Sequence, residues 1–108
     1  MIQYLNKTIM KLSYVYILSN KKNTTLYIGV TSNLIKRITD HKEEKGSIFT
    51  KKYRLAKLLY FEEFTDIRYA IEREKQLKNW HREWKLDLIK SVNPKFKDLF
   101  YDLLGLEA

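Results

Sequence analysis

Two short apolar segments near the start of the chain have the pattern of β-strands. Residues 14–18 (YVYIL) and 25–30 (TLYIGV) are rich in tyrosine and β-branched residues and flank a polar stretch, SNKKNT. A hairpin turn centred in the middle of this polar stretch would pair Tyr16 with Tyr27. Side chains alternate along a strand, so both tyrosines would then share one face with Gly29. The opposite face is wholly aliphatic and is the more obvious core face.

The rest of the chain predicts one further strand and several helices, from apolar periodicity and capping residues. The expected elements are a helix over 33–44, a loop over 45–53, a strand over about 55–64, a helix from Asp66 to about 79, a helix ending near 90, and a last helix with Asn93 at its N-cap and Pro94 at its first position. The order β-β-α-β-α-α-α predicts an α+β fold, in which helices flank a small three-stranded antiparallel sheet.

The length of the chain, 108 residues, fits one small domain. We expect this domain over residues 13–90, an extension over 1–12 before it, and a C-terminal helix over 91–108 packed on it. No apolar run reaches the ~18–20 residues of a membrane span, and the first twelve residues do not form a signal peptide. Cysteine is absent, which excludes disulfides and thiolate metal sites and favours a cytoplasmic location.

The charge of the chain favours a polyanionic partner. Lys and Arg number 21 against 13 Asp and Glu, a formal net charge of +8, and nucleic acid is the commonest polyanion that such proteins bind. Many small soluble domains are equally basic without such a partner. An anionic membrane surface is disfavoured, because no stretch forms a basic amphipathic helix free of acidic residues.

The helix over 33–44 carries two candidate functional residues on one side. Arg37 and His41 lie one turn apart on the border of its apolar stripe, so both are expected to be half-buried and to point along the sheet. A border arginine often buries its stem and extends its charge into solvent. A packing role and a role in a site therefore both remain open.

One carboxylate lies where an apolar residue is expected. Glu74 falls within the apolar arc of the helix that follows Asp66, and Lys78 lies one turn further on. Burying a bare carboxylate is costly. Glu74 is therefore expected to be paired, protonated or bound to a cation. The pair would be with Lys78 and would contribute about 0.2–0.5 kcal/mol, and the cation would be a hard one such as Mg²⁺ or Mn²⁺. The helix alone does not distinguish these alternatives.

Several of these features, in this order, resemble the GIY-YIG nuclease superfamily. They are YVY at 14–16, YIG at 27–29, Arg37, His41 and the last glutamate of AIERE at 70–74. The resemblance covers about residues 13–90, and the segments GSIFTKKY and NPKFKDL are similar to the small, stand-alone, single-domain bacterial members. The first glycine of the family motif is replaced by Tyr14, which puts the fit of the first strand in question but not the catalytic set.

The resemblance implies a role for each matching residue. Tyr16 and Tyr27 would line the site and position or deprotonate the attacking water. Arg37 would contact the scissile phosphate, and His41 would act as an auxiliary acid or base. Glu74 would be the single protein carboxylate that holds the divalent metal, Mg²⁺ or Mn²⁺.

Other residues are expected to contact the nucleic acid. Gly29 would leave room for the substrate backbone. Thr50, Lys51 and Lys52 follow the glycine of the predicted loop and are plausible phosphate contacts, and Lys78 could add another.

The main functional hypothesis is a divalent-metal-dependent DNA endonuclease, structure-selective or related to DNA repair, that acts on branched or damaged DNA, with a protein partner as one way to supply targeting. One alternative is a binding module that keeps the fold and the basic surface without useful turnover. Another is a small RNA-binding domain, which predicts that Tyr14, Tyr16 and Tyr27 are exposed on an open face of the sheet.

Overall fold

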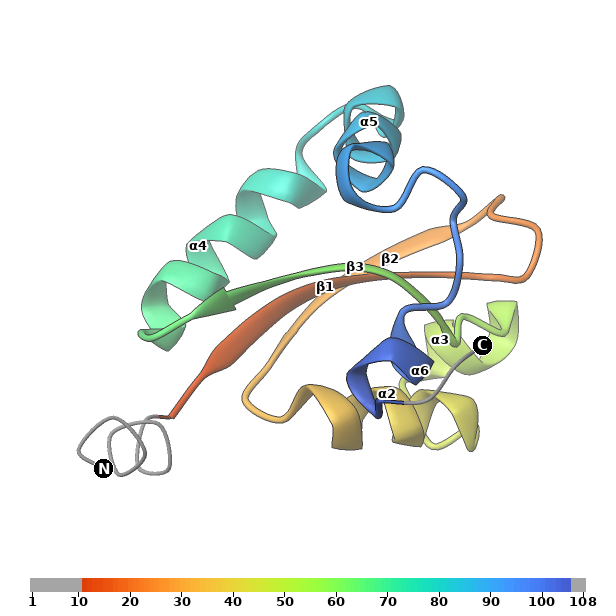
Figure 1. Cartoon of the computed structure of the whole chain (residues 1–108), viewed down its shortest axis with the longest axis horizontal. Helices are drawn as coiled ribbons and strands as arrows, with labels where there is room; N and C mark the ends of the chain where they lie inside the picture. The colour runs from red at the N-terminus through yellow and green to blue at the C-terminus, as the bar shows by residue number, and fades with distance from the viewer. Residues whose placement is uncertain (1–10, 106–108) are drawn as a thin grey trace.

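The structure is a computed structural model that describes residues 11–105. Residues 1–10 of the predicted N-terminal extension and residues 106–108 of the predicted C-terminal helix lie outside the described residues (Figure 1). The described elements, in chain order, are β1 (Ser13–Ser19), β2 (Leu26–Thr31), α2 (Leu34–Lys42), α3 (Ile48–Tyr53), β3 (Lys57–Phe64), α4 (Ile67–Lys78), α5 (Arg82–Val92) and α6 (Phe100–Leu103).

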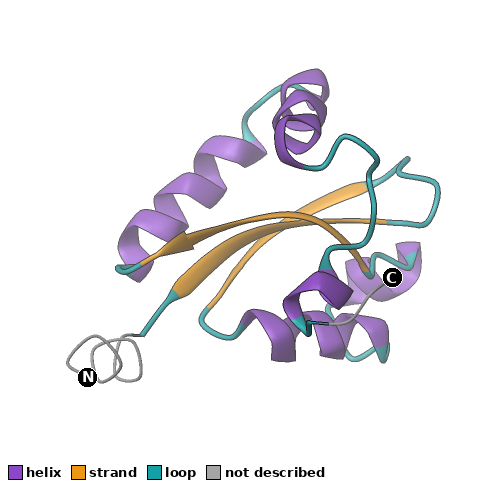
Figure 2. Cartoon of the chain, viewed as in Figure 1, coloured by secondary structure: helices purple, strands orange, loops and turns teal. Residues whose placement is uncertain are grey.

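The three strands form one antiparallel sheet in the order β2-β1-β3. Helices α4 and α5 lie on one face of this sheet, and α2, α3 and α6 lie on the other (Figures 1 and 2). The predicted α+β class with a small three-stranded antiparallel sheet is therefore confirmed. None of the helices in the described part of the chain is long and apolar enough to cross a membrane.

The predicted register of the first hairpin is wrong by two residues. Tyr16 lies opposite Gly29, and Leu18 lies opposite Tyr27. The turn is centred one residue later than expected, because the Asn20 side chain accepts hydrogen bonds from the next two threonine amides and Asn23 adopts a left-handed conformation with φ of 58°. A shift of two preserves the alternation of side chains, so Tyr16 and Tyr27 still share one face.

Both faces of the sheet are buried. On one face, aliphatic residues of β1 and β2 pack against Ala70 and Leu77 of α4. On the other, Tyr16 packs with Leu34 and Ile38 of α2 and is 0% exposed. The protein therefore has two hydrophobic cores, one on each face of the sheet, and the aliphatic face forms only one of them. The RNA-binding hypothesis, which requires the tyrosines to lie on an open face, is contradicted because helices cover that face.

Residues 45–53, predicted to form a loop, contain helix α3. Ser47 is its N-cap, and the Ser47 Oγ accepts a hydrogen bond from the Thr50 amide at 3.2 Å. Arg54 closes the helix in a left-handed conformation with φ of 55°. A helix of six residues is too short to show a periodic apolar pattern, and the capping serine is the signal that could have revealed it.

The predicted start and length of the last helix are wrong. Asn93 does not cap a new helix; it ends α5 and is only 2% exposed. Its Nδ2 donates to the carbonyl oxygens of Leu59 at 3.0 Å and Lys97 at 2.8 Å, which ties the C-terminal segment to β3. Phe96 has φ of 52°, so the chain turns where the helix was expected. Between Phe96 and the last described residue, Gly105, the structure has one short helix, α6.

Candidate functional site

Gly29 makes room for the ring of Tyr16. The two residues lie directly opposite each other on β2 and β1. A β-carbon built at Gly29 would lie 2.5 Å from both Cζ and Oη of Tyr16, closer than any ordinary contact. The space that a side chain would fill at Gly29 is therefore occupied by the phenol, and not left free for a substrate backbone as the sequence suggested.

Three rings gather around this point. The centroids of Tyr16 and Tyr27 are 6.3 Å apart, and the His41 ring lies 6.0 Å from the first and 6.1 Å from the second. The Tyr16 hydroxyl is 3.4 Å from His41 Nε2. Two residues of the first hairpin and one residue of α2 thus form one aromatic cluster, although His41 was expected only at the border of its helix.

A hydrogen-bonded chain on the far side of His41 indicates its tautomer. Thr50 Oγ1 donates to the Ser47 carbonyl at 3.0 Å and lies 3.2 Å from His41 Nδ1. Because the single hydroxyl proton of Thr50 is used in this way, its oxygen accepts from the Nδ1–H, which leaves Nε2 as the acceptor facing Tyr16. Burial, reinforced by the nearby Arg37 charge, lowers the pKa of His41 and favours the neutral ring.

This arrangement corrects the expected role of Thr50. The residue is 3% exposed and engaged with His41, so it is not a surface contact for phosphate. Gly46 allows this packing, because a β-carbon there would meet the His41 ring and the Thr50 hydroxyl.

A cavity of about 270 Å³ opens beside the aromatic cluster. Its lining comes from β2, α2 and the segment before α3, and consists of Tyr27, Arg37, Asp40, His41, Lys45, Gly46 and Ser47. The structure thus brings three of the expected site residues, Tyr27, Arg37 and His41, to one cavity.

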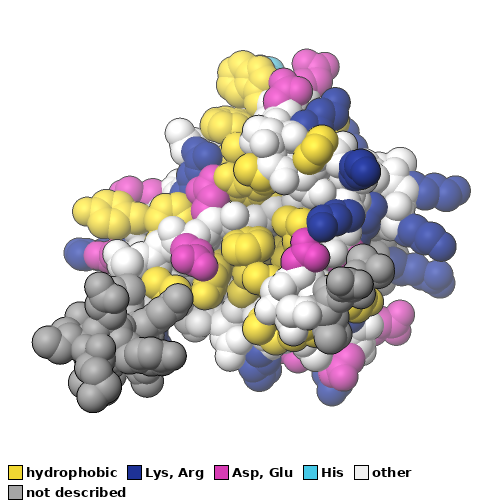
Figure 3. All heavy atoms as spheres, viewed as in Figure 1, with side chains coloured by type: hydrophobic (Ala, Val, Ile, Leu, Met, Phe, Trp, Pro, Cys, Tyr) yellow, Lys and Arg dark blue, Asp and Glu magenta, His cyan; other side chains and the backbone are white. Residues whose placement is uncertain are grey.

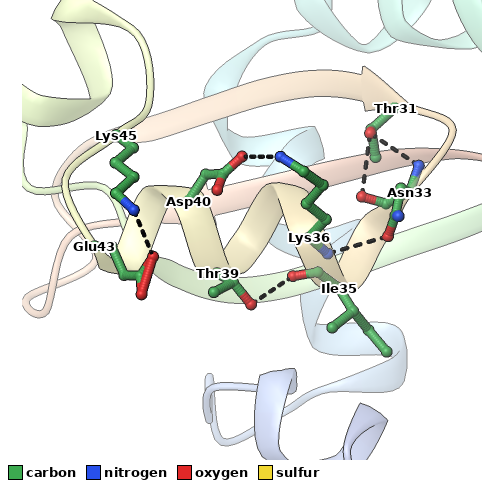
Figure 4. A network of polar contacts seen from close by, with 8 residues as sticks. All are labelled: Thr31, Asn33, Ile35, Lys36, Thr39, Asp40, Glu43 and Lys45. Atoms are coloured by element: carbon green, nitrogen blue, oxygen red, sulfur yellow. Dashed lines mark hydrogen bonds and ion pairs between the residues drawn. The ribbon is translucent and has the colours of Figure 1, made fainter.

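The charges around this cavity leave Arg37 available to an anion. Lys36 Nζ pairs with Asp40 Oδ2 at 3.1 Å, and Lys45 Nζ pairs with Glu43 Oε1 at 3.3 Å (Figure 4). No acidic side chain among residues 11–105 forms an ion pair with Arg37, which is exposed rather than half-buried as expected. The acidic group of the lining is therefore neutralised by Lys36, whereas no acidic side chain among the described residues competes with phosphate for the Arg37 guanidinium.

The pKa of Tyr16 is shifted by burial and also by residues of the cavity and by Glu74. Burial raises the pKa of the Tyr16 phenol to about 12, and the charges of Tyr27 and Glu74 act in the same direction, while Arg37 opposes them. All three groups are therefore close enough to act on one hydroxyl. Tyr16 itself is poorly suited to lose a proton at neutral pH.

Glu74 approaches from the opposite layer of the protein. It lies on α4, does not line the cavity, and its side chain is 17% exposed. Its Oε1 is 3.4 Å from Lys78 Nζ, so the ion pair considered from the sequence is present. Lys78 is the more exposed partner, with 52% of its side chain accessible.

The donor set suits a hard cation that takes few protein ligands. No group of three or more His, Asp or Glu side chains able to hold a metal exists within the described range. Mg²⁺ commonly uses one or two carboxylates and completes its shell with water and substrate phosphate. Glu74, a largely buried carboxylate with one loose ionic partner, fits this mode of binding.

Two features of α3 bear on nucleic-acid binding. Lys51 and Lys52 are exposed, as their expected role requires. Phe49, which the sequence analysis did not single out, stacks on Tyr27 with a centroid distance of 6.2 Å and an interplanar angle of 30°. It was missed because the helix that positions it was read as a loop.

Comparisons with known proteins agree with this architecture. Residues 12–87 match the family model described as the GIY-YIG catalytic domain. A UPF0213 protein of Clostridium perfringens is 43% identical over 84 residues, which cover 78% of this chain and 89% of the relative. A UPF0213 protein of Syntrophus aciditrophicus is 40% identical over 87 residues, which cover 80% of this chain and 98% of the relative.

A solved structure is also similar. The solution NMR structure of a UPF0213 protein from Bacillus halodurans matches with a TM-score of 0.53 and 25% identity, covering 89% of this chain and 99% of that one. The family match spans most of the chain and includes every residue from Tyr16 to Glu74 discussed above. This chain therefore belongs to the GIY-YIG family, with the UPF0213 proteins among its relatives.

Proposed function

We propose that this protein is a divalent-metal-dependent DNA endonuclease that hydrolyses phosphodiester bonds. The proposal rests on Arg37, which lines one cavity with Tyr27 and His41. Its guanidinium is exposed and has no acidic partner among the described residues. The nuclease-type fold of the family and the net charge of +8 support the same conclusion.

Arg37 would bind and activate the scissile phosphate. A guanidinium presents a planar fork of donors that matches two phosphate oxygens, and its charge is fixed at any physiological pH. A charge held in place before the reaction stabilises the negative charge that builds up on the phosphorus oxygens in the transition state.

Tyr27 is the tyrosine that can meet the attacking water. It lines the cavity, whereas Tyr16 is 0% exposed and its pKa is raised to about 12 by burial. The His41 ring centroid lies 6.1 Å from that of Tyr27, and burial lowers the pKa of His41, which favours a neutral ring able to accept a proton released in this cluster. Tyr16 and Thr50 would then act as positioning residues that fix the His41 ring.

Glu74 would hold the divalent cation, Mg²⁺ or Mn²⁺. When bound there, the cation would supply positive charge that stabilises the phosphate oxygens and the leaving oxygen. Lys78 could release Glu74 at little cost, because an ion pair with a half-exposed lysine contributes only about 0–1 kcal/mol. The freed ammonium could then contact a DNA phosphate.

The proposal is tested by incubating labelled linear, flapped and branched DNA with the protein in Mg²⁺, in Mn²⁺ and in EDTA. We expect cleavage of at least one substrate in the presence of metal, lost in EDTA. Arg37→Ala should reduce the rate at least 100-fold, whereas Lys90→Ala, which removes an exposed lysine of α5 in the opposite layer, should stay within about twofold. Equal rates for the two variants would overturn the role of Arg37.

The Glu74–Lys78 ion pair also favours a second candidate, a DNA-binding module without turnover. In that case the pair is permanent and the carboxylate needs no cation. Binding of DNA by the wild type, with no cleavage under any metal condition, would support this alternative.

A further inference from the structure

Helix α3 carries an exposed apolar surface that the protein's own core does not use. Ile48 is 87% exposed, Phe49 46% and Tyr53 42%. Single exposed apolar residues are common on soluble proteins, but here three of them lie on one helix of six residues. We call these three residues the α3 surface.

The rings of the α3 surface form a path that leads away from the cavity. Phe49 stacks on Tyr27, whose side chain lines the cavity, with centroids 6.2 Å apart. Tyr53 follows at 4.7 Å from Phe49. A flexible chain with flat groups at regular intervals, lying in the cavity at Arg37, could place its next groups against these rings.

The charge around the α3 surface identifies the kind of chain. Residues 45–61 include five basic residues and no acidic one, the basic residues being Lys45, Lys51, Lys52, Arg54 and Lys57. Lys52 Nζ lies 5.4 Å from the Tyr53 ring centroid, so one positive charge is directly beside the aromatic path. In Figure 3, dark blue basic side chains also project from the side of the molecule where Figure 1 shows the β1–β2 turn.

We propose that the α3 surface stacks against unpaired bases of the DNA strand whose backbone enters the cavity. Aromatic rings interleaved with positive charge are the usual means of binding single-stranded nucleic acid without sequence preference. In a duplex the base faces are stacked on one another and are closed to side chains, so the rings distinguish unpaired from paired DNA. This inference rests on the proposed nuclease function, and names its substrate class as DNA with a single-stranded segment beside the scissile bond.

The test measures binding separately from cleavage. A fluorescent 20-nucleotide single strand, the blunt duplex of the same sequence and a flapped duplex are titrated with the protein in EDTA, and fluorescence anisotropy gives each Kd. The wild type should bind the single strand and the flapped duplex more tightly than the blunt duplex. Tyr53→Ala should weaken single-strand binding by about 5- to 150-fold, the usual range for one stacked base.

Matched variants separate the contribution of the Tyr53 ring to DNA binding from other effects of the substitution. Tyr53→Phe keeps the stacking face and should bind like the wild type. Tyr69→Ala removes a tyrosine that is 61% exposed on α4, in the opposite layer, and should leave the Kd unchanged. Phe49→Ala should resemble Tyr53→Ala, but Tyr53 is the cleaner test because Phe49 also supports Tyr27.

Equal affinities of the wild type for single-stranded and blunt DNA would overturn the inference, and so would an unchanged Kd in Tyr53→Ala. Self-association of the wild type that is lost in Tyr53→Ala, with DNA binding unaffected, would assign the surface to a second copy of the chain and also overturn it. A protein that shows the expected binding but cleaves nothing would refute the proposed function while supporting the stacking surface.

Discussion

A single added methyl group at Gly29 tests how the candidate site is built. A β-carbon at this position would lie 2.5 Å from Cζ and Oη of Tyr16. The phenol cannot move aside freely, because it is 0% exposed and packs beside the rings of Tyr27 and His41. Gly29→Ala must therefore displace the ring or separate the strands.

The size of the effect follows from two opposing contributions. Overpacking a filled core typically costs about 1–3 kcal/mol, and the reduced freedom of the unfolded chain on replacing glycine by alanine returns about 0.4–1 kcal/mol. We expect a net loss of about 1–2 kcal/mol in the free energy of unfolding. For a domain of this size, that corresponds to a fall in Tm of roughly 5–10 °C.

Thermal unfolding followed by circular dichroism measures this loss, and a double-mutant cycle identifies its cause. Tyr16→Leu removes the atoms that the new methyl group would meet, so Gly29→Ala should cost less in that background than in the wild type. An equal cost in both backgrounds, or a Tm unchanged by Gly29→Ala alone, would refute the close packing of Tyr16 over Gly29.

Three further predictions concern the aromatic cluster. Tyr27→Phe should slow DNA cleavage by about 10²- to 10⁴-fold and Tyr16→Phe by less, measured as single-turnover rates; the reverse order would make Tyr16 the group that meets the water. The folded protein holds the pKa of His41 below its unfolded value of about 6.5, so the unfolded chain binds the proton more readily and stability should fall as pH drops through that value. The wild type should thus lose more Tm than His41→Gln between pH 7 and pH 5, and parallel losses would contradict this role of the histidine. Thr50→Val should cost about 1–3 kcal/mol in urea unfolding, because the buried His41 Nδ1–H loses its acceptor, whereas a midpoint unchanged from wild type would show that this hydrogen bond is unimportant.

The sequence predicted which side chains share a face better than it predicted their partners. The alternation of polar and apolar residues placed Tyr16 and Tyr27 on one face, and this remains true with the observed register. The pairing itself depended on the turn, where hydrogen bonds of the Asn20 side chain and the left-handed conformation of Asn23 set the centre. Such a local effect has no counterpart in hydrophobic periodicity.

Thr50 illustrates a contact that the sequence could not reveal. Beside Lys51 and Lys52 it has the composition of a surface loop, which led to the expectation of a phosphate contact. In the structure Ser47 starts a short helix, and this helix turns Thr50 inward against His41 while the two lysines remain exposed. The burial of Thr50 depends on a residue of another helix, nine positions earlier, and not on its neighbours in sequence.

For Glu74, in contrast, the sequence did predict the environment of the side chain. Its place in the apolar arc of its helix predicted a largely buried carboxylate, and its side chain is 17% exposed. The same reasoning left open whether Lys78 or a cation is its partner. In the protein alone, Lys78 is the partner of Glu74, with an ion pair at 3.4 Å. A cation can replace Lys78 as the partner only when metal and substrate are present.

The most direct test of the account is the single-turnover rate of DNA cleavage by Glu74→Gln in Mg²⁺, compared with Glu72→Gln. Both variants neutralise a carboxylate on α4 with little change in shape, but Glu72 is exposed and away from the proposed site. We predict that Glu74→Gln cleaves at least 100-fold more slowly than the wild type and that Glu72→Gln stays within twofold. A Glu74→Gln rate equal to that of the wild type would contradict the claim that Glu74 completes a metal-dependent nuclease site.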